Sequence, residues 1–380
     1  MDPVKGIIST DDHVVEPPNV WTDSLPKQRW GDRIPHLERD SEGVDRWIID
    51  GRIVPLLGSG SAAALMPDRT REPRTWDEVP AAAHRPADRL KAMDADGIDR
   101  SVLYPSVAGV AGETFAAIED PELERDCVRA YNDWLLEEWA AASPRFIPQC
   151  IVPISSPAAA VAEVRRAVAA GHRGVIFPPV TDQLRGVAHI NEPVWEELWT
   201  ACEELRVPLC FHAGALPALE MEPYAGYSAV IKSAMHDIAR PASAIGFLSN
   251  LLMSHILERH RNLMVVFGES TLGWVNFVIE TVEHNMKQFG ALNHVKYDLT
   301  PREMTKTQCR FVGWYDDENL RTICRQLGAE CVLWAWNFPD ATSDWPDARR
   351  LNEERFSRLG ESDRRKVMWE NATNLYRLSS

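Results

Sequence analysis

The sequence predicts an α/β protein that folds as a (β/α)8 barrel, the TIM barrel fold. Short runs rich in β-branched and aromatic residues alternate with helical patterns, which is typical of βα units and a parallel sheet. Eight such runs follow one another along the 380 residues. Because no internal repeat, low-complexity segment or linker separates them, we expect one domain over 1–380.

The first strand is predicted in "GIISTDDHVVEPP" (6–18), where an apolar run ends in Asp11, Asp12 and His13. An irregular stretch rich in Pro, Gly and Arg follows from about 17 to 87, and we expect it to form an insertion over one mouth of the barrel. Within the insertion, "RWIIDGRIVPLLG" predicts a β-hairpin, because Asp50-Gly51 suits a two-residue turn.

Seven further strands are predicted, and each has a helical partner. They cover 101–106, 146–154, 173–179, 207–214, 263–270, 309–314 and 330–339, of which 309–314 carries the weakest strand signal. The helical patterns are clearest at 124–142, 158–171 and 192–205. Eight strands, each with a helix as its partner, complete the predicted barrel.

The composition restricts the kinds of molecule that the protein is expected to bind. A formal net charge of -15 and a pI near 5.2 disfavour nucleic acid and anionic membranes as partners, because an acidic surface repels both. The chain has no run of about 18 apolar residues and no signal-peptide pattern, so we expect a soluble cytoplasmic protein that binds a small molecule. The seven cysteines form no CxxC pair and are expected to be buried, reduced thiols.

Metal-capable side chains lie at the carboxyl ends of two predicted strands, where such barrels carry their chemistry. Alternate residues of a strand point the same way, so Asp11 and His13 should both face the mouth. His212, in "CFHAG", would add a second imidazole from the opposite wall. A carboxylate and two imidazoles can hold one divalent ion and leave coordination positions open.

The chain resembles the amidohydrolase-2 group of the amidohydrolase superfamily over nearly its whole length. The segments that carry the resemblance, in the expected order, are "DDHVVEPPNVW", "DRLKAMDADGIDRSVLYPS", "AYNDWL", "RGVIFPP", "CFHAG", "VVFGESTLGWV", "NFPDATSDWP" and "ENATNLYRL". That group includes aminocarboxymuconate-semialdehyde and resorcylate-type decarboxylases. The resemblance implies a distorted (β/α)8 barrel with one divalent metal, Zn or Mn, and we expect Zn before Mn.

The resemblance also implies roles for individual residues. Asp11, His13 and His212 occupy the positions of metal ligands, and Glu269 falls where relatives carry a catalytic His or Glu. At the eighth strand relatives typically carry Asp and His, but this chain has Asn337 and Asp340 in "AWNFPD". Asn can offer a carbonyl oxygen to a metal but cannot exchange a proton at neutral pH.

Three explanations of Asn337 stay open at this point. Glu269 or Asp340 has taken over the acid/base role, or Asn337 is an inactivating replacement of Asp, or the protein runs a different reaction. The neighbouring Trp334 and Trp336 also depart from the small residues of relatives, which favours natural divergence. We expect Glu269, Asp340 and Asn337 in the catalytic set.

The substrate is expected to contact Trp336, His284 and Trp274. His284 lies in a helical pattern similar to a His-rich family segment, and it can either reach the mouth or cap a helix contact. The leading hypothesis is a metal-dependent lyase or hydrolase, decarboxylase-like, for a small cyclic carboxylated or amide- or imine-bearing substrate. The alternative is a barrel that has lost catalysis and binds a small ligand as a scaffold. By resemblance, we expect a homodimer.

Overall fold

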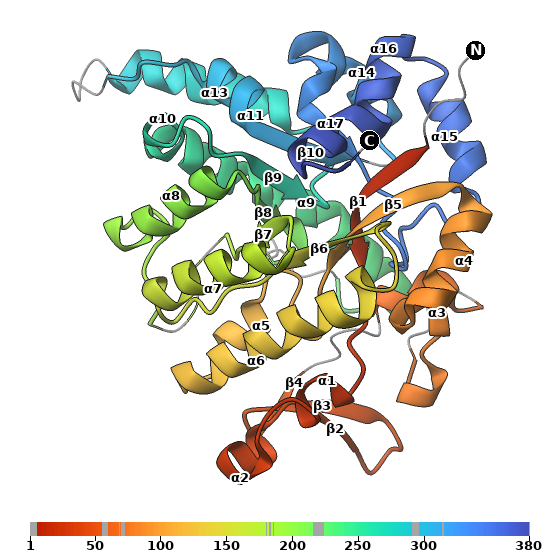
Figure 1. Ribbon diagram of the computed structural model, residues 1–380. Coiled ribbons are helices and arrows are strands. Elements are labelled where there is room, and N and C mark those ends of the chain that lie inside the picture. Colours follow the sequence, from red (N-terminus) through yellow and green to blue (C-terminus); the bar gives the residue numbers. More distant parts are fainter. Residues whose placement is uncertain are drawn as a thin grey trace.

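The structure is a computed structural model, and it describes residues 6–54, 60–67, 69, 73–179, 181, 184, 186–215, 224–290, 296–313 and 315–379. Its centre is an eight-stranded sheet of parallel neighbours that curls into a nearly closed barrel (Figure 1). The strand order follows the chain: β1 (Ile7–His13), β5 (Ile98–Tyr104), β6 (Phe146–Cys150), β7 (Gly174–Ile176), β8 (Leu209–His212), β9 (Val265–Gly268), β10 (Cys309–Gly313) and β11 (Val332–Trp334).

All eight strands predicted from the sequence are confirmed, although most are shorter than expected. The predicted runs continued into the loops that leave the barrel, because those loops begin with apolar residues as well. Trp314, the last residue of the predicted seventh strand, lies outside the described residues. Residues of these strands are almost all buried, as expected for a parallel sheet covered on its outer face by helices.

The barrel is closed at its carboxyl end by the segment that follows β11. The backbone N–H of Asn337 donates to the carbonyl of Asp11 at 3.0 Å, and that of His13 donates to the carbonyl of Phe338 at 2.8 Å. These two hydrogen bonds fasten the last strand to the end of the first. The loop after β11 is therefore held directly beside the side chains that leave β1.

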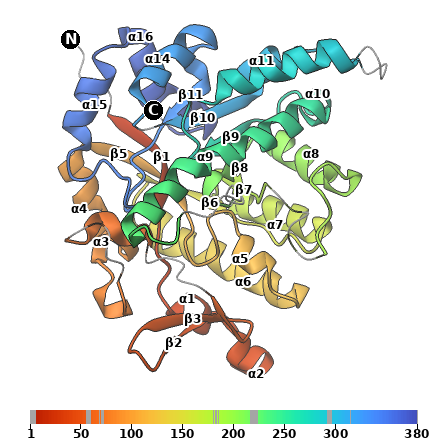
Figure 2. The ribbon, with the colours of Figure 1, turned by 180° about the vertical axis from the view of Figure 1, so that it is seen from behind.

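Helices surround the sheet, and several begin with Pro after an extended residue, which suits the first helical turn (Figures 1 and 2). Their bounds are α1 (Asn19–Thr22), α2 (Lys27–Trp30), α3 (Ala81–His84), α4 (Pro86–Asp96), α5 (Glu113–Ala116), α6 (Pro121–Trp134), α7 (Pro157–Ala170), α8 (Glu196–Leu205), α9 (Ala229–Met253), α10 (Ile256–Arg259), α11 (Val275–Asn285), α13 (Pro301–Gln308), α14 (Asp317–Gln326), α15 (Ala348–Phe356), α16 (Glu361–Arg365) and α17 (Asn371–Leu375).

The predicted insertion after β1 contains a small antiparallel sheet of β2 (His36–Arg39), β3 (Asp45–Ile49) and β4 (Arg52–Val54). The β3–β4 hairpin turns at Asp50 and Gly51, both at positive φ, which confirms the predicted two-residue turn. Residues 55–59 of the predicted hairpin lie outside the described residues. The strand β2 was not predicted, because its half-exposed residues lack the alternating pattern of a strand.

The core is rich in aromatic side chains. Trp21, Trp139, Trp195 and Trp199 are almost fully buried, so their large apolar surfaces are removed from water. All seven cysteines are free thiols and six are buried, as the sequence predicts. Among the described residues, no helix is both long and apolar enough to cross a membrane.

Candidate metal centre

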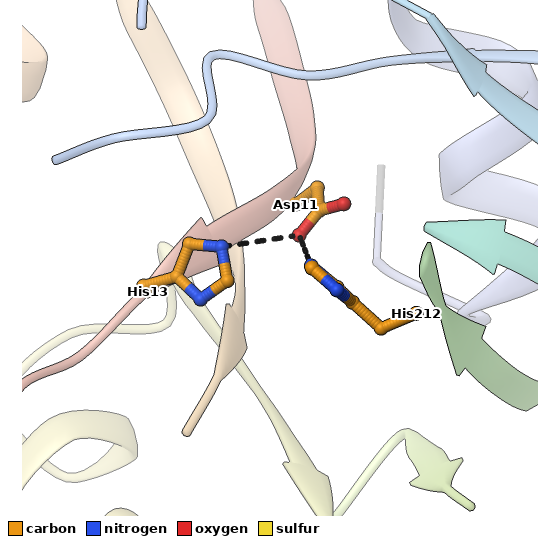
Figure 3. Close-up of side chains that lie close together, drawn as sticks. All are labelled: Asp11, His13 and His212. Atoms are coloured by element: carbon orange, nitrogen blue, oxygen red, sulfur yellow. Dashed lines mark ion pairs between the residues drawn. The ribbon is translucent and has the colours of Figure 1, made fainter. Parts of the chain in front are cut away.

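Three metal-capable side chains meet where β1 and β8 end (Figure 3). Asp11 and His13 come from β1 and His212 from β8, and one ligand atom of each lies within 4.8 Å of the other two. The Asp11 Oδ1 atom is 3.3 Å from His212 Nε2 and 3.8 Å from His13 Nε2. The three side chains are buried, so this is an enclosed cluster rather than a chance surface grouping.

The Asp11 carboxylate is fixed from the side of β9. Its Oδ2 accepts a hydrogen bond of 2.7 Å from the backbone N–H of Glu269. This approach favours glycine just before Glu269, because a Cβ on Gly268 would lie only 3.0 Å from Asp11 Oδ2 and 3.2 Å from His212 Cδ2. The sequence "FGES" at the end of β9 thus makes room for the cluster.

His212 is oriented by its own chain. The backbone N–H of Gly214 donates to His212 Nδ1 at 3.0 Å, and the Nε2 edge of the ring faces Asp11. The rings of His13 and His212 meet edge to face, with centroids 5.3 Å apart. Each imidazole is therefore held in one orientation relative to the carboxylate.

The cluster has the chemistry of a divalent cation site. Asp11 Oδ1 and Asn337 Oδ1 are buried oxygens without a hydrogen-bond donor among the described residues, an arrangement that is costly unless something else pairs them. Burial lowers the pKa of His13, which favours the neutral imidazole that a metal requires. One carboxylate and two imidazoles fit a single divalent ion with open positions.

A second carboxylate lies against the cluster. The Glu269 Oε2 atom is 3.6 Å from His212 Nδ1, and Glu269 itself is buried at positive φ just after β9. Burial, and then the charge of Glu269, raise the pKa of Asp340. Asp340 therefore keeps its proton to a higher pH than an exposed aspartate would.

Asn337 and Asp340 belong to the loop that closes the barrel. Asn337 has φ of 53°, a conformation that Asn tolerates better than most residues, and its Nδ2 donates to Thr342 Oγ1 at 2.9 Å. Asp340 Oδ1 accepts from both the backbone N–H and the hydroxyl of Thr342 at 2.8 Å. Thr342 thus sets the directions of both side chains.

The structure places the three residues expected to contact substrate in different surroundings. Trp336 is fully buried, stacks on Phe338 and donates its indole N–H to Asp96 at 2.7 Å, so its ring belongs to the packing beside α4. The Trp274 ring packs against Phe267 and Phe311. His284 is exposed near the end of α11, about 15 Å along the helix from Trp274. The position of a residue at a strand end or in a helix does not predict the direction in which its side chain points.

The structure adds residues around the cluster that sequence reasoning did not select. The Tyr104 ring, at the end of β5, lies with its centroid 5.2 Å from that of His212. The side chain of Glu113 accepts from the backbone N–H of Ala111 at 2.8 Å, and burial raises its pKa despite the nearby His212. Tyr104 could have been found as a polar residue at a strand end, whereas Glu113 begins the short helix α5, which offers no such signal.

Asp12, the carboxylate between the two β1 residues of the cluster, serves the fold instead. A bulge between Ser9 and Asp12 interrupts the pairing of β1 with β5 and turns Asp12 toward the opposite side. There it accepts from the hydroxyls of Ser9 and Ser101 and from the backbone N–H of Phe338. Burial raises the pKa of Asp12 to about 7.

Comparison with known proteins agrees with this architecture. The amidohydrolase family model matches residues 49–378. Over 334 residues the chain is 25% identical to gamma-resorcylate decarboxylase of Rhizobium radiobacter, covering 80% of this chain and 90% of the relative.

Two solved structures share the fold. A crystal structure of an amidohydrolase from Mycobacterium avium subsp. paratuberculosis K-10 superimposes with a TM-score of 0.72 at 22% identity, covering 98% of this chain and 99% of the other. Dihydroxybenzoic acid decarboxylase from Polaromonas sp. JS666, solved with manganese and the inhibitor 2-nitroresorcinol, gives a TM-score of 0.64 at 18% identity, with coverage of 98% and 97%.

Proposed function

We propose that this chain, which belongs to the amidohydrolase family, is a metal-dependent decarboxylase of a small aromatic carboxylic acid. The observation that carries the proposal is the juxtaposition of the Asp11, His13 and His212 cluster with the carboxyl pair Glu269 and Asp340. Decarboxylation needs both parts, because the departing carboxylate must be held and the ring carbon must receive a proton. The decarboxylase relatives favour this enzyme over a barrel without catalysis.

The cluster would hold one divalent ion through Asp11, His13 and His212, with the amide oxygen of Asn337 as a neutral neighbour. When bound, such an ion supplies Lewis-acid polarisation of a substrate oxygen and orients the substrate. The manganese in the Polaromonas structure supports Mn²⁺ over the Zn²⁺ expected from the sequence. Hard oxygen donors from the substrate suit Mn²⁺ well.

The carboxyl pair would move the proton. We assign the proton transfer to the reacting carbon to Glu269, whose carboxyl lies against His212. Asp340 would share this proton with Glu269. Asp340 Oδ1 already accepts two hydrogen bonds from Thr342, which leaves Oδ2 as the atom that carries a proton. Asn337 contributes no proton and would only bind.

Turnover of a panel of hydroxybenzoates by the manganese-loaded protein tests this function, with carbon dioxide release as the measurement. Decarboxylation of acids that carry a hydroxyl beside the carboxyl group, but not of those that lack it, is expected. The proposal fails if no acid of the panel loses carbon dioxide while amides, imines or lactones of similar size are hydrolysed. That outcome would favour the hydrolase hypothesis instead.

The assembly and location of the protein stay predictions from the sequence. We propose a cytoplasmic homodimer built from one barrel domain per chain. Light scattering tests the dimer, and a mass of 42.8 kDa at micromolar concentration, that of one chain, would contradict it.

A further inference from the structure

The end of the barrel opposite the metal cluster holds a cavity of about 860 Å³. Its wall is formed where β8, β9, β10 and β11 begin, together with the end of α17 and the residues after it. The lining includes Val207, Pro208, Met264 and Leu375, which form an apolar part of the wall. Figures 1 and 2 both show the C-terminus beside β10, where this wall lies.

Three arginines line this cavity: Arg206, Arg310 and Arg377. Among the described residues, none of their guanidinium groups forms an ion pair with a carboxylate. Arg310 is partly buried and donates its Nη1 to the backbone carbonyls of Lys306 and Cys309. Burial lowers the pKa of Arg310, the direction expected for a cation withdrawn from water.

The carboxylates of the same cavity are engaged elsewhere. Glu203 pairs with His260 and accepts from Asn262, while Glu204 pairs with Arg165. Glu330 pairs with Lys366. Each of these carboxylates thus has a partner outside the three arginines, and the arginine guanidinium groups keep their charge-assisted donors for a ligand.

Two of the arginines also stand where glycine would be favoured. Arg206 ends α8 at φ 54° and Arg377 follows α17 at φ 50°. A left-handed backbone is unfavourable for a long side chain, and glycine is the usual residue at such a helix end. Two of the positive charges therefore stand at positions where the backbone conformation disfavours arginine.

We propose that this cavity is a binding site for a small molecule with two or more anionic groups, carboxylate or phosphate. Guanidinium forks bind both kinds of oxygen in the same bidentate way, and the apolar wall would cover the carbon skeleton between them. The site does not depend on the reaction at the other end of the barrel. It lies at the face of the barrel where catalytic residues are not found.

Calorimetric titration of the metal-loaded protein tests the proposal, with fructose 1,6-bisphosphate as the phosphate probe and propane-1,2,3-tricarboxylate as the carboxylate probe. We expect one molecule of at least one probe to bind per chain, and the stronger of the two identifies the ligand class. Arg206→Gly and Arg377→Gly should each weaken that binding by about tenfold or more, because each removes charge-assisted hydrogen bonds. Both substitutions relieve a positive φ, so the folded protein should persist.

Arg173→Gln is the matched control. Arg173 is an exposed arginine just before β7, at the same end of the barrel but outside this cavity, and its loss should leave binding unchanged. The proposal is overturned if neither probe produces a heat of binding at concentrations up to about 10 mM, where even weak specific binding would be detected. It is equally overturned if the Arg206→Gly, Arg377→Gly double variant binds as tightly as the natural protein.

Discussion

The carboxylate of Asp11 and the backbone of Glu269 are joined by a hydrogen bond of 2.7 Å across the barrel mouth. One end of this contact belongs to the first strand and the other to the residue after β9, 258 positions later. Because the same Glu269 places its carboxyl 3.6 Å from His212, the candidate ligands and the candidate proton carrier are held as one unit. Substitution of a candidate ligand should therefore change the metal content, and substitution of the candidate proton carrier should change the rate of turnover.

His212→Ala should remove most of the bound metal while leaving the barrel folded. His212 lies at a strand end, and its ring serves the cluster more than the apolar core. We expect metal content below about one tenth of that of the unchanged protein after reconstitution with Mn²⁺ and gel filtration. Circular dichroism serves as the control for folding. Unchanged metal content would mean that His212 is not a ligand.

Glu269→Gln should lower turnover by about 10²–10⁴-fold with little effect on metal content. Glutamine keeps the shape and the backbone N–H that supports Asp11, but it carries no exchangeable proton. The measurement is kcat on the best substrate of the panel, with metal analysis of the same sample. If Glu269→Gln kept full activity and Asp340→Asn abolished it, Asp340 would be the principal proton carrier.

Asn337→Asp should leave activity unchanged or lower it. The side-chain oxygen of Asn337 is buried, and its backbone N–H is hydrogen-bonded to the carbonyl of Asp11, so a carboxylate at this position would add a buried negative charge close to that of Asp11. The comparison of kcat and metal affinity between the two proteins measures this effect. A gain of several orders of magnitude would instead identify Asn337 as an inactivating residue.

Gly268→Ala should weaken metal binding by about tenfold or more, because the new Cβ would press on Asp11 Oδ2 and on the His212 ring. Gly246→Ala is the matched control. Gly246 lies within α9 with open space where its Cβ would stand, so this change should stabilise the protein by about 0.5–1 kcal/mol. Metal titration and thermal unfolding of both variants check the pair. Equal metal affinity in the two variants would show that the close approach at Gly268 is unimportant.

His172 should make the protein less stable in acid. Burial lowers the pKa of His172 to about 4, below the 6.5 of an exposed histidine, so the unfolded chain binds this proton more tightly. Its contribution is complete above pH of about 6.5 and is lost as the pH falls toward 4, by up to about 3 kcal/mol.

The His172→Gln variant isolates this effect, because glutamine can still donate to the Asn132 carbonyl that His172 contacts at 3.0 Å. The measurement is the free energy of unfolding of both proteins by urea between pH 4 and 7. Groups other than His172 cancel in the difference. If the two stability curves stayed parallel across this range, His172 would not be the acid-sensitive group.

The sequence by itself determined the eight strands, the hairpin turn at Asp50-Gly51 and the three candidate ligands. Each of these follows from local chemistry: apolar runs form strands, two residues with positive φ make the turn, and Asp11, His13 and His212 stand at strand ends. Because parallel strands of a barrel end on one face, strand ends far apart in the chain could be assigned to one site without knowing any distance.

Only the tertiary structure decided which other side chains join them. Trp336 follows β11 as Asn337 does, yet its indole N–H donates to Asp96 at the end of α4. His284 is left exposed near the end of α11, and Glu113 reaches the neighbourhood of His212 from the start of α5. The cavity lined by Arg206, Arg310 and Arg377 likewise brings together residues from distant elements. Their grouping depends on how those elements pack, and no local sequence pattern predicts it.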